Sequence, residues 1–463
     1  MTSADGGGAA RGGGRRAGLF ATVCLVALAP VKFSLPVVLY HLDAWPRGIE
    51  EWGFMSWPSS VFFGLLALCL VLTVREIGSG GMPLRPLAPA VGFLLAQGLS
   101  AAFTMDRPLS GAVMALFASL VVGYVLGCAL GRDDRGLRWL LGGWLVGACL
   151  VAWSGIGQAT GGLEETRKFL ESHPEMGAGM PELWERVSRG RVFATFVYPN
   201  ALGGYVATTI FLVAAWVLMG RGEANFRFRL ALGTTLGLAL LFCLWKSQSK
   251  GGYAALVATA LVLSLAGGVR RRLAIGIAVG VLLLGTIGFA AGYGQRGVEK
   301  GKRTLSARVD YWRAAWRIGL DYPVLGSGPG TFSKLYPRYK AWDAENTRLV
   351  HNSYLQMWCD SGIVGFAAFA VLLPGTLFAV WRRVRTVPVR ERWPWTLVWA
   401  GLVAFAIHSL VDFDLYLVGN AWPAFVLLGA LGARCSSVGF CEYSASHGHD
   451  GACPSNSFCQ GTP

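Results

Sequence analysis

Residues 351–380 read HNSYLQMWCDSGIVGFAAFAVLLPGTLFAV, a polar start followed by an apolar run in which Asp360 is the one charged residue. The run over residues 353–380 is long enough to cross ~30 Å of hydrocarbon as a helix. A segment in lipid must satisfy its own backbone polar groups, which favours a helix over an open strand. This stretch therefore predicts a transmembrane helix, with His351 at the point where the helix starts.

The same pattern is repeated along the chain. The 463 residues are 54% hydrophobic and only 14% charged, which excludes a soluble globular protein. The runs lack the ten-residue alternation of a transmembrane barrel. We expect an all-α, polytopic transmembrane helical bundle of about twelve spans. They are predicted near residues 17–40, 59–74, 87–103, 110–130, 137–158, 193–219, 230–247, 252–268, 272–293, 353–380, 394–412 and 415–434.

The distribution of Lys and Arg predicts the orientation of these spans. If the N-terminus is inside, the inner segments carry twenty Lys and Arg, and the short outer loops carry four (Arg47, Arg107, Lys246 and Lys250). Cytoplasmic loops are the ones enriched in Lys and Arg. Both termini are therefore expected in the cytoplasm, with the long loops 159–192 and 294–350 outside.

The segments outside the membrane domain, 17–434, have distinct compositions. Residues 1–16 are rich in glycine and arginine and are predicted to be a disordered lead. Loop 159–192 has no regular apolar period before residue 191, so most of it is expected to be irregular. The tail, 435–463, contains four Cys and two His. Their spacing is unusual for a zinc site, and the composition favours a disordered cytoplasmic tail.

Loop 294–350, between spans 9 and 10, is strongly basic. It has eleven Lys and Arg against five acids. Within it, LSARVDYWRAAWRIGL (305–320) places Leu305, Val309, Trp312, Trp316 and Leu320 on one stripe of a helix flanked by Arg308 and Arg313. Such a Trp-rich stripe suits a helix lying at a membrane surface, and Pro323 is expected to end it.

His351 is the leading candidate for proton chemistry. A histidine beside a helix start is more often a capping or structural residue. Its place at the outer membrane edge, however, gives access to both water and lipid headgroups, and histidine is the side chain suited to general base work near neutral pH. The helix N-terminus and the basic loop should disfavour its protonation.

Four cations are candidates for binding a lipid pyrophosphate. A charge run is usually a solvated face, but Arg308 and Arg313 lie beside apolar surface, where a guanidinium can bind phosphate in bidentate fashion. Arg191 precedes the sixth span and Lys250 opens the eighth, both at the same outer edge as His351. These residues could equally be anchors that reach to the membrane interface.

Other polar residues have simpler interpretations. Asp412 and Asp414 form an Asp-x-Asp pair after the eleventh span, but Asp412 is interpreted as a partner of the cations rather than a metal ligand. His408, one turn earlier, is interpreted as buried structure. LGSGPG (325–330) lacks the strand and helix of a nucleotide loop, and a tight turn explains it.

These motifs follow one another as RVFATFVYPNALGGY, SQSKGGYAAL, SARVDYWRAAWRIGLDYPVLGSGPGTF, HNSYLQMWCDSGIVG and HSLVDFDLYL. In this order they resemble the O-antigen ligase and polymerase superfamily, which includes the bacterial protein O-oligosaccharyltransferases. The resemblance covers residues 190–432 by motif. It implies a glycosyltransferase-C type membrane fold in the bacterial inner membrane.

The resemblance also implies an activity and roles for residues. Family members transfer a glycan from undecaprenyl pyrophosphate to an acceptor hydroxyl, without metal or other cofactor. By match, His351 would be the catalytic histidine, Arg191 and Arg308 the pyrophosphate arginines and Asp412 the outer carboxylate. Lys250 stands where the family usually has Arg, which keeps the charge but loses the bidentate fork.

The sequence therefore predicts an O-antigen ligase-like, inverting glycosyltransferase of the cell envelope. Its partners would be a polyprenyl pyrophosphate-linked glycan, a lipid- or protein-linked acceptor and membrane lipids, with no nucleic acid. The alternatives left open are a polysaccharide polymerase of the same superfamily, a flippase of lipid-linked sugars and an inactive assembly scaffold.

Overall fold

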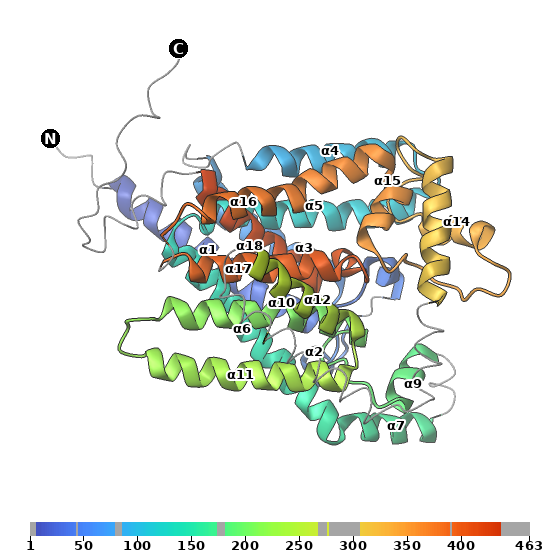
Figure 1. Ribbon diagram of the computed structural model, residues 1–463, viewed down its shortest axis with the longest axis horizontal. Coiled ribbons are helices and arrows are strands. Elements are labelled where there is room, and N and C mark those ends of the chain that lie inside the picture. The colour runs from blue at the N-terminus through green and yellow to red at the C-terminus, as the bar shows by residue number, and fades with distance from the viewer. Residues whose placement is uncertain are drawn as a thin grey trace, which may run out of the picture.

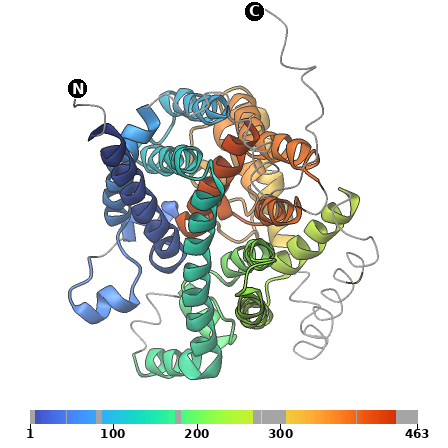
Figure 2. The same cartoon turned by 90° about the vertical axis from the view of Figure 1, so that its left-hand side faces the viewer.

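The computed structural model describes residues 6–42, 45–78, 86–173, 181–266, 306–388 and 391–436, together with residue 276. Within these ranges the chain is helical and has no strand, only one isolated bridge between Pro36 and Leu417. The long helices run side by side in a bundle (Figure 1; Figure 2). They are α1 (Gly6–Lys32), α3 (Ser59–Gly78), α4 (Leu87–Ala102), α5 (Arg107–Leu130), α6 (Asp134–Gly157), α10 (Pro199–Met219), α11 (Phe226–Ser247), α12 (Lys250–Leu265), α15 (Ser353–Ala370), α17 (Trp393–His408) and α18 (Val418–Ser436).

Shorter elements connect the long helices or cover their ends. They are η1 (Val37–Leu42), α2 (Ile49–Phe54), η2 (Gln158–Gly162), α7 (Leu163–Ser172), α9 (Pro181–Ser188), a helix over residues 306–321, α14 (Phe332–Tyr339), η3 (Val371–Gly375), α16 (Thr376–Val384) and η4 (Asp414–Tyr416). The π-helical turn η3 joins α15 to α16, so that residues 353–384 form one long, bent helix.

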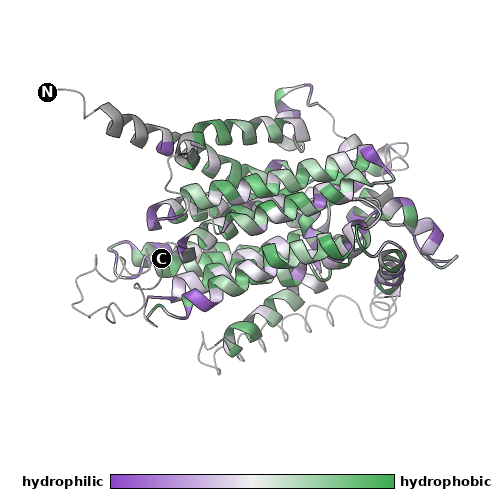
Figure 3. Cartoon of the chain, turned by 90° about the horizontal axis from the view of Figure 1, so that it is seen from above, coloured by the Kyte–Doolittle hydropathy of each residue, from purple (hydrophilic) through white to green (hydrophobic). Residues whose placement is uncertain are grey.

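Six of these helices are long and apolar enough to cross a membrane: Gly14–Lys32, Arg107–Leu130, Asp134–Ser172, Pro199–Met219, Phe226–Ser247 and Ser353–Val384. Apolar residues follow the length of the bundle and polar residues gather near its ends (Figure 3). Helices occupy eleven of the twelve predicted spans. The ninth, 272–293, lies outside the described residues except for residue 276, and the count of twelve stays a prediction.

Two predictions of irregular structure are wrong. Loop 159–192 contains α7 and α9, and the charges of α7 support its helix because Arg167 pairs with Glu164 and Glu171, three and four residues away. The lead over residues 1–16 was expected to be disordered, but α1 begins at Gly6. Arg15 anchors this part of α1 through an ion pair with Asp133, 2.5 Å away.

Helices α5 and α18 pack closely at the centre of the bundle because glycine faces backbone at their crossing. A Cβ atom on Gly127 of α5 would lie 1.9 Å from the carbonyl oxygen of Val426, and one on Gly429 of α18 would lie 2.0 Å from that of Tyr124. Small residues at such crossings let two backbones approach, which is how helices associate in lipid.

Both described chain ends lie at one end of the bundle. The start of α6 holds the two together, since Asp133 pairs with Arg15 near the start of α1 and Asp134 pairs with Arg434 near the end of α18. Figure 1 shows the start of α1 at the left, opposite the end that carries α14. The start of α1 and the end of α18 are therefore on the same side of the bundle.

The opposite end carries the helix over residues 306–321, which ends before Pro323 as the sequence predicts. It packs on α14 in a small second core that includes Tyr311, Ile318, Phe332 and Val350. The apolar stripe predicted from the sequence is not the face that packs in this core, because two of its residues, Trp316 and Leu320, are exposed. This small core positions the segment that leads into α15.

Candidate functional site

The start of α15 presents His351. Asn352 caps the helix, and its side-chain oxygen accepts hydrogen bonds from the backbone nitrogens of Tyr354 and Leu355, each 3.0 Å away. His351, just before the cap, has a left-handed backbone conformation with φ of 54°. The next turn is fixed from outside the helix, because Ser353 N donates to the carbonyl oxygen of Ser409 at 2.8 Å. His351 thus projects from a turn that is held on both sides.

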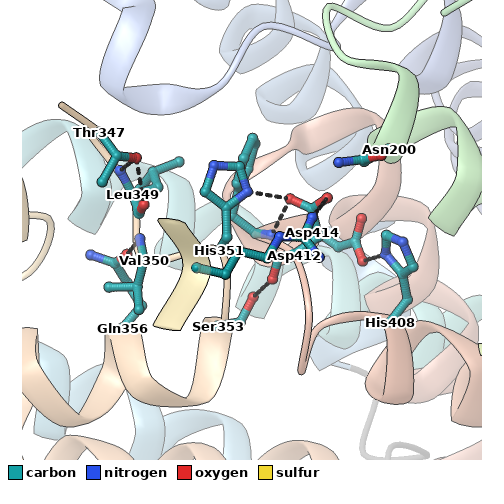
Figure 4. Close-up of polar contacts among 12 residues, drawn as sticks. Asn200, Thr347, Leu349, Val350, His351, Ser353, Gln356, His408, Asp412 and Asp414 are labelled. Carbon is teal, nitrogen blue, oxygen red and sulfur yellow. Dashed lines mark hydrogen bonds and ion pairs between the residues drawn. The ribbon is translucent and has the colours of Figure 1, made fainter. Parts of the chain in front are cut away.

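Asp412 meets His351 from the turn between α17 and α18. Nδ1 of His351 lies 3.2 Å from Oδ1 of Asp412, and the same oxygen accepts a hydrogen bond from Phe413 N at 2.9 Å (Figure 4). The Asp412 side chain is only 4% exposed, whereas that of His351 is 26% exposed. The carboxylate is therefore buried behind a histidine that solvent can reach.

Arg308 supplies positive charge to this pair. Its Nη2 lies 3.8 Å from Oδ2 of Asp412, and its side chain is largely buried. Tyr311, one turn along the same helix, stacks on the ring of His351 at 5.9 Å between centroids. The helix over residues 306–321 thus brings a guanidinium and an aromatic ring to the His351–Asp412 pair. We call His351, Asp412 and Arg308 together the His–Asp–Arg cluster.

The charges of this cluster favour an ionised Asp412. Burial by itself raises the pKa of this carboxyl group. The hydrogen bond from His351 and the positive charge of Arg308 oppose that effect, and the pKa of Asp412 is held below its usual range. The cluster therefore keeps a buried negative charge against the Nδ1 side of the histidine.

A second histidine–carboxylate pair lies directly behind the cluster. Nδ1 of His408 is 2.5 Å from Oδ2 of Asp414, and Oδ1 of Asp414 accepts from the side-chain nitrogen of Asn420 at 2.9 Å. All three side chains are buried. The backbone oxygen of His408 also accepts from Asp412 N at 3.0 Å. His408 is buried structure, as predicted, and it holds the turn that carries Asp412.

Arg191 and Lys250 lie on elements that meet at this end of the bundle. Arg191 donates from Nε to the carbonyl oxygen of Ser247 at 3.0 Å and from Nη2 to Oδ1 of Asn200 at 3.1 Å. Figure 4 draws Asn200 on the Asp412 side of the site. Lys250 is exposed at the first position of α12, and a Cβ atom on Gly251 beside it would lie 3.1 Å from Nε2 of His408.

Arg313 is not part of the His–Asp–Arg cluster. Its side chain is 72% exposed, and its Nη1 lies 3.8 Å from Oδ1 of Asp310. Five residues separate it from Arg308, which places the two about 140° apart around a helix. The two arginines that flank the predicted stripe therefore face different directions.

Sequence reasoning missed three polar residues around the site, Arg186, Asn200 and Asn420. Arg186 of α9 stacks on the ring of Tyr198 at 4.4 Å, and Tyr198 packs edge-on against Phe413 at 5.5 Å. Asn200 accepts a hydrogen bond from Arg191, and Asn420 donates one to Asp414. Asn200 stands in the quoted YPN motif, which is a usable signal, but nothing in the sequence singles out Asn420.

The Asp-x-Asp pair does not converge on one point. Asp412 is engaged by His351 and Asp414 by His408 (Figure 4). In the part of the chain that the structure describes, no three His, Cys, Asp or Glu side chains are grouped as metal ligands. The carboxylates orient imidazoles in this arrangement.

The fold and the site define a helical integral membrane protein with a histidine, a carboxylate and an arginine brought together at one end of its bundle. Residues 235–370 match the sequence model of the O-antigen ligase family. This match covers part of the chain and supports the resemblance to the O-antigen ligase superfamily that the motifs indicate. Lys250, Arg308, Arg313 and His351 lie inside the matched stretch, and Arg191 and Asp412 lie outside it. No curated protein matches the chain.

Proposed function

We propose that the protein is a membrane glycosyltransferase that moves a glycan from a polyprenyl pyrophosphate to an acceptor hydroxyl. The His351–Asp412 hydrogen bond is the observation that carries the proposal. With Nδ1–H donated to Asp412, Nε2 of His351 keeps its lone pair on the side away from the carboxylate. That nitrogen is available to act as a base toward a hydroxyl group.

In the proposed step, Nε2 of His351 takes the proton of the acceptor hydroxyl as its oxygen attacks the anomeric carbon. The bond from that carbon to the pyrophosphate oxygen breaks, and its electron pair leaves with the pyrophosphate. Displacement from the opposite face inverts the anomeric centre. Asp412 stabilises the imidazolium as it forms, because its carboxylate is already in place and ionised.

The pyrophosphate is assigned to the cations. Arg308 is the best placed of them, since it lies within the His–Asp–Arg cluster. Arg191 and Lys250 are proposed to bind the same group from the segment before α10 and from the first position of α12. Arg313, whose side chain is 72% exposed, is not assigned to the pyrophosphate. Fixed positive charge at a departing phosphate is worth more in a site that excludes water. The mechanism uses no metal and no cofactor.

A flippase is a weaker reading of the same membrane protein. A transporter needs ionisable groups that can change partners within the membrane. Two such groups that the sequence places within spans are fully engaged. Nζ of Lys32 donates to the carbonyl oxygens of Trp52, Gly53 and Met55, and the Asp360 side chain accepts three hydrogen bonds from nitrogen donors and one from a thiol. This favours a fixed reaction site.

The proposed location is the bacterial inner membrane, with both termini cytoplasmic and His351 facing outward. This orientation is supported by the basic residues in the last turn of α16 and just after it, Arg382, Arg383 and Arg385. A reporter that is active only outside the cytoplasm should be on when fused after Lys334 and off when fused after Arg385. A cytoplasmic signal from the Lys334 fusion would contradict the proposal.

The function is tested by assaying transfer in membranes with a purified polyprenyl pyrophosphate-linked glycan and a lipid acceptor. His351→Ala should lower the rate by about 10² to 10⁴, the usual worth of general base assistance, with protein level and donor binding retained. His173→Ala removes an exposed histidine at the end of α7 and is the matched control.

The products separate the two activities within the superfamily. Glycan on the acceptor lipid indicates a ligase, and longer lipid-linked glycans indicate a polymerase. Wild-type turnover by His351→Ala would place the base elsewhere, with Asp412 and His408 as the next candidates.

A further inference from the structure

Asp360 is a fully buried carboxylate inside α15 with a complete set of donors. Its Oδ2 accepts from Gly330 N at 2.9 Å and from Nε2 of Gln356 at 2.7 Å, and its Oδ1 accepts from Phe332 N at 2.9 Å. The residue is 1% exposed. A buried charge is costly unless hydrogen bonds satisfy it, so these three donors define where the carboxylate must sit.

The glycine-rich loop over residues 325–330 is built around this carboxylate. Gly326, Gly328 and Gly330 all have positive φ, at 71°, 115° and 81°. Gly328 N donates to the backbone oxygen of Asp360 at 2.8 Å, and a Cβ atom on Gly326 would lie 2.2 Å from that same oxygen. The LGSGPG motif is therefore a seat for the bend of α15, and it fixes Asp360 from outside the helix.

Gln356 connects Asp360 to the residue before His351. Its Nε2 donates to Asp360, and its Oε1 accepts from Val350 N at 2.8 Å. Both ends of the amide are used, so turning it over would break two buried hydrogen bonds. Because the backbone nitrogen of Val350 can only donate, Oε1 of Gln356 must face it, and Nε2 of Gln356 is then directed at Oδ2 of Asp360.

His351 needs such support because its backbone is strained. A left-handed conformation costs a residue with a side chain ~1 kcal/mol or more, and it persists only where the surroundings hold it. The neighbouring positions are held by Gln356 at Val350 N and by Ser409 at Ser353 N. This conformation is the one in which the imidazole reaches Asp412.

We propose that Gln356 and Asp360 are positioning residues for His351, which they act on through the backbone of Val350. The inference rests on the proposed function of His351 as the base. Neither residue touches the reacting groups, and each acts by keeping Nδ1 of His351 on Asp412 and Nε2 toward the acceptor. A fixed ring lowers the barrier to proton transfer without changing how the donor is bound.

The test is a steady-state comparison with the lipid-linked donor in membranes. Gln356→Met keeps the size of the side chain and removes both hydrogen bonds. We expect kcat to fall by about 10- to 100-fold, as for a small misplacement of a reacting group, with KM for the donor changed by less than about twofold. The control is Ser361→Ala, which lies in α15 like Gln356. It removes a buried 2.6 Å hydrogen bond to Gln97 of α4 and should keep its kcat.

A pair of variants tests the link from Asp360 to Gln356. Gln356→Glu still accepts from Val350 N but brings a second carboxylate against Asp360, so it should lose kcat. Adding Asp360→Asn supplies an amide donor toward the new carboxylate and should recover part of that kcat. Independent structural damage would instead add the two losses.

The outcomes separate this inference from the function on which it rests. An active His351→Ala overturns the proposed function. An inactive His351→Ala beside a folded Gln356→Met with wild-type kcat overturns only the positioning role. If Gln356→Met is not recovered in membranes, the double variant decides. A recovery of kcat supports the link, and a loss equal to the sum of the single losses overturns it.

Discussion

Nδ1 of His351 lies 3.2 Å from Oδ1 of Asp412, although 61 positions separate the two residues. The two come from the start of α15 and the turn after α17, which Ser353 joins by donating to backbone oxygens of Ser409 and Asp412. The pair is therefore a product of helix packing.

Asp412→Asn tests whether the charge of this carboxylate matters. An amide can turn its nitrogen toward the ring and favour the wrong tautomer, which leaves a proton on Nε2. We expect transfer to fall by about 10² to 10⁴ with donor binding retained. Asp414→Glu is not a suitable control because that site is packed, so His173→Ala serves again. A variant with wild-type turnover would remove Asp412 from the mechanism.

Arg308→Lys tests the bidentate contact with the donor. The charge remains but the guanidinium fork is lost, so both donor binding and departure of the pyrophosphate should weaken. A loss of about 10- to 100-fold in kcat/KM is expected, comparable to one charge-assisted hydrogen bond. Arg317→Lys, at an exposed position on the same helix, is the matched control. Equal losses in the two variants would contradict the assignment.

Arg313→Lys distinguishes the two predicted arginines of that helix. Its side chain is exposed and pairs only loosely with Asp310, so the change in kcat/KM should stay within about twofold, in the range of exposed ion pairs. A loss as large as that of Arg308→Lys would show that Arg313 also binds the donor.

The helices were predictable because hydropathy is a local property. Apolar runs gave the positions of α5, α10 and α11 directly, and Pro323 gave the end of the helix over residues 306–321. The face on which that helix packs was not predictable. Small residues, Ala314 and Ala315, allow close contact with α14, while Trp316 points outward. A stripe of large residues marks an apolar face without saying whether protein or lipid covers it.

The site was predictable as separate residues but not as contacts. His351 and Asp412 were both identified, yet their hydrogen bond depends on how α15 meets the turn after α17. The role of LGSGPG also depends on a partner in another helix, since Asp360 lies 30 positions from Gly330. Long-range polar contacts of this kind leave no periodic signal in the chain.

Asp106 offers a test by pH and stability. It caps α5 by accepting from Leu109 N at 3.0 Å, and Nζ of Lys334 lies 2.9 Å from its other oxygen. The hydrogen bond from Leu109 and the charge of Lys334 hold the pKa of Asp106 below its usual range. Its stabilising effect is therefore complete above the unfolded pKa, near 4, and is lost as the pH falls through the lower folded value.

Two variants separate the cap from the charge. At pH 7 Asp106→Asn keeps the cap and should cost only ~0–1 kcal/mol, since Lys334 is exposed, whereas Asp106→Ala should cost ~1 kcal/mol more. The thermal midpoint of the purified protein measures both. The difference between wild type and Asp106→Asn should vanish in acid and shrink in high salt. A difference that grows as the pH falls would contradict the sign of the shift.

His408 is expected to respond to the position of its donor nitrogen. In His408→Asn the amide nitrogen replaces Nδ1 and can still donate to Asp414. In His408→Gln the amide extends toward α12 and leaves Oδ2 of the buried carboxylate without its donor, while Asn420 still binds Oδ1. Breaking a buried pair in this way costs ~3–5 kcal/mol. The turn that carries Asp412 should then shift, because Asp412 N is hydrogen-bonded to the backbone oxygen of His408.

We expect His408→Asn to keep the transfer rate within about tenfold of wild type and His408→Gln to lose more than that. The thermal midpoint and the transfer rate are measured on the same preparations. Equal activity in the two variants would mean that the His408–Asp414 hydrogen bond does not hold Asp412 in place.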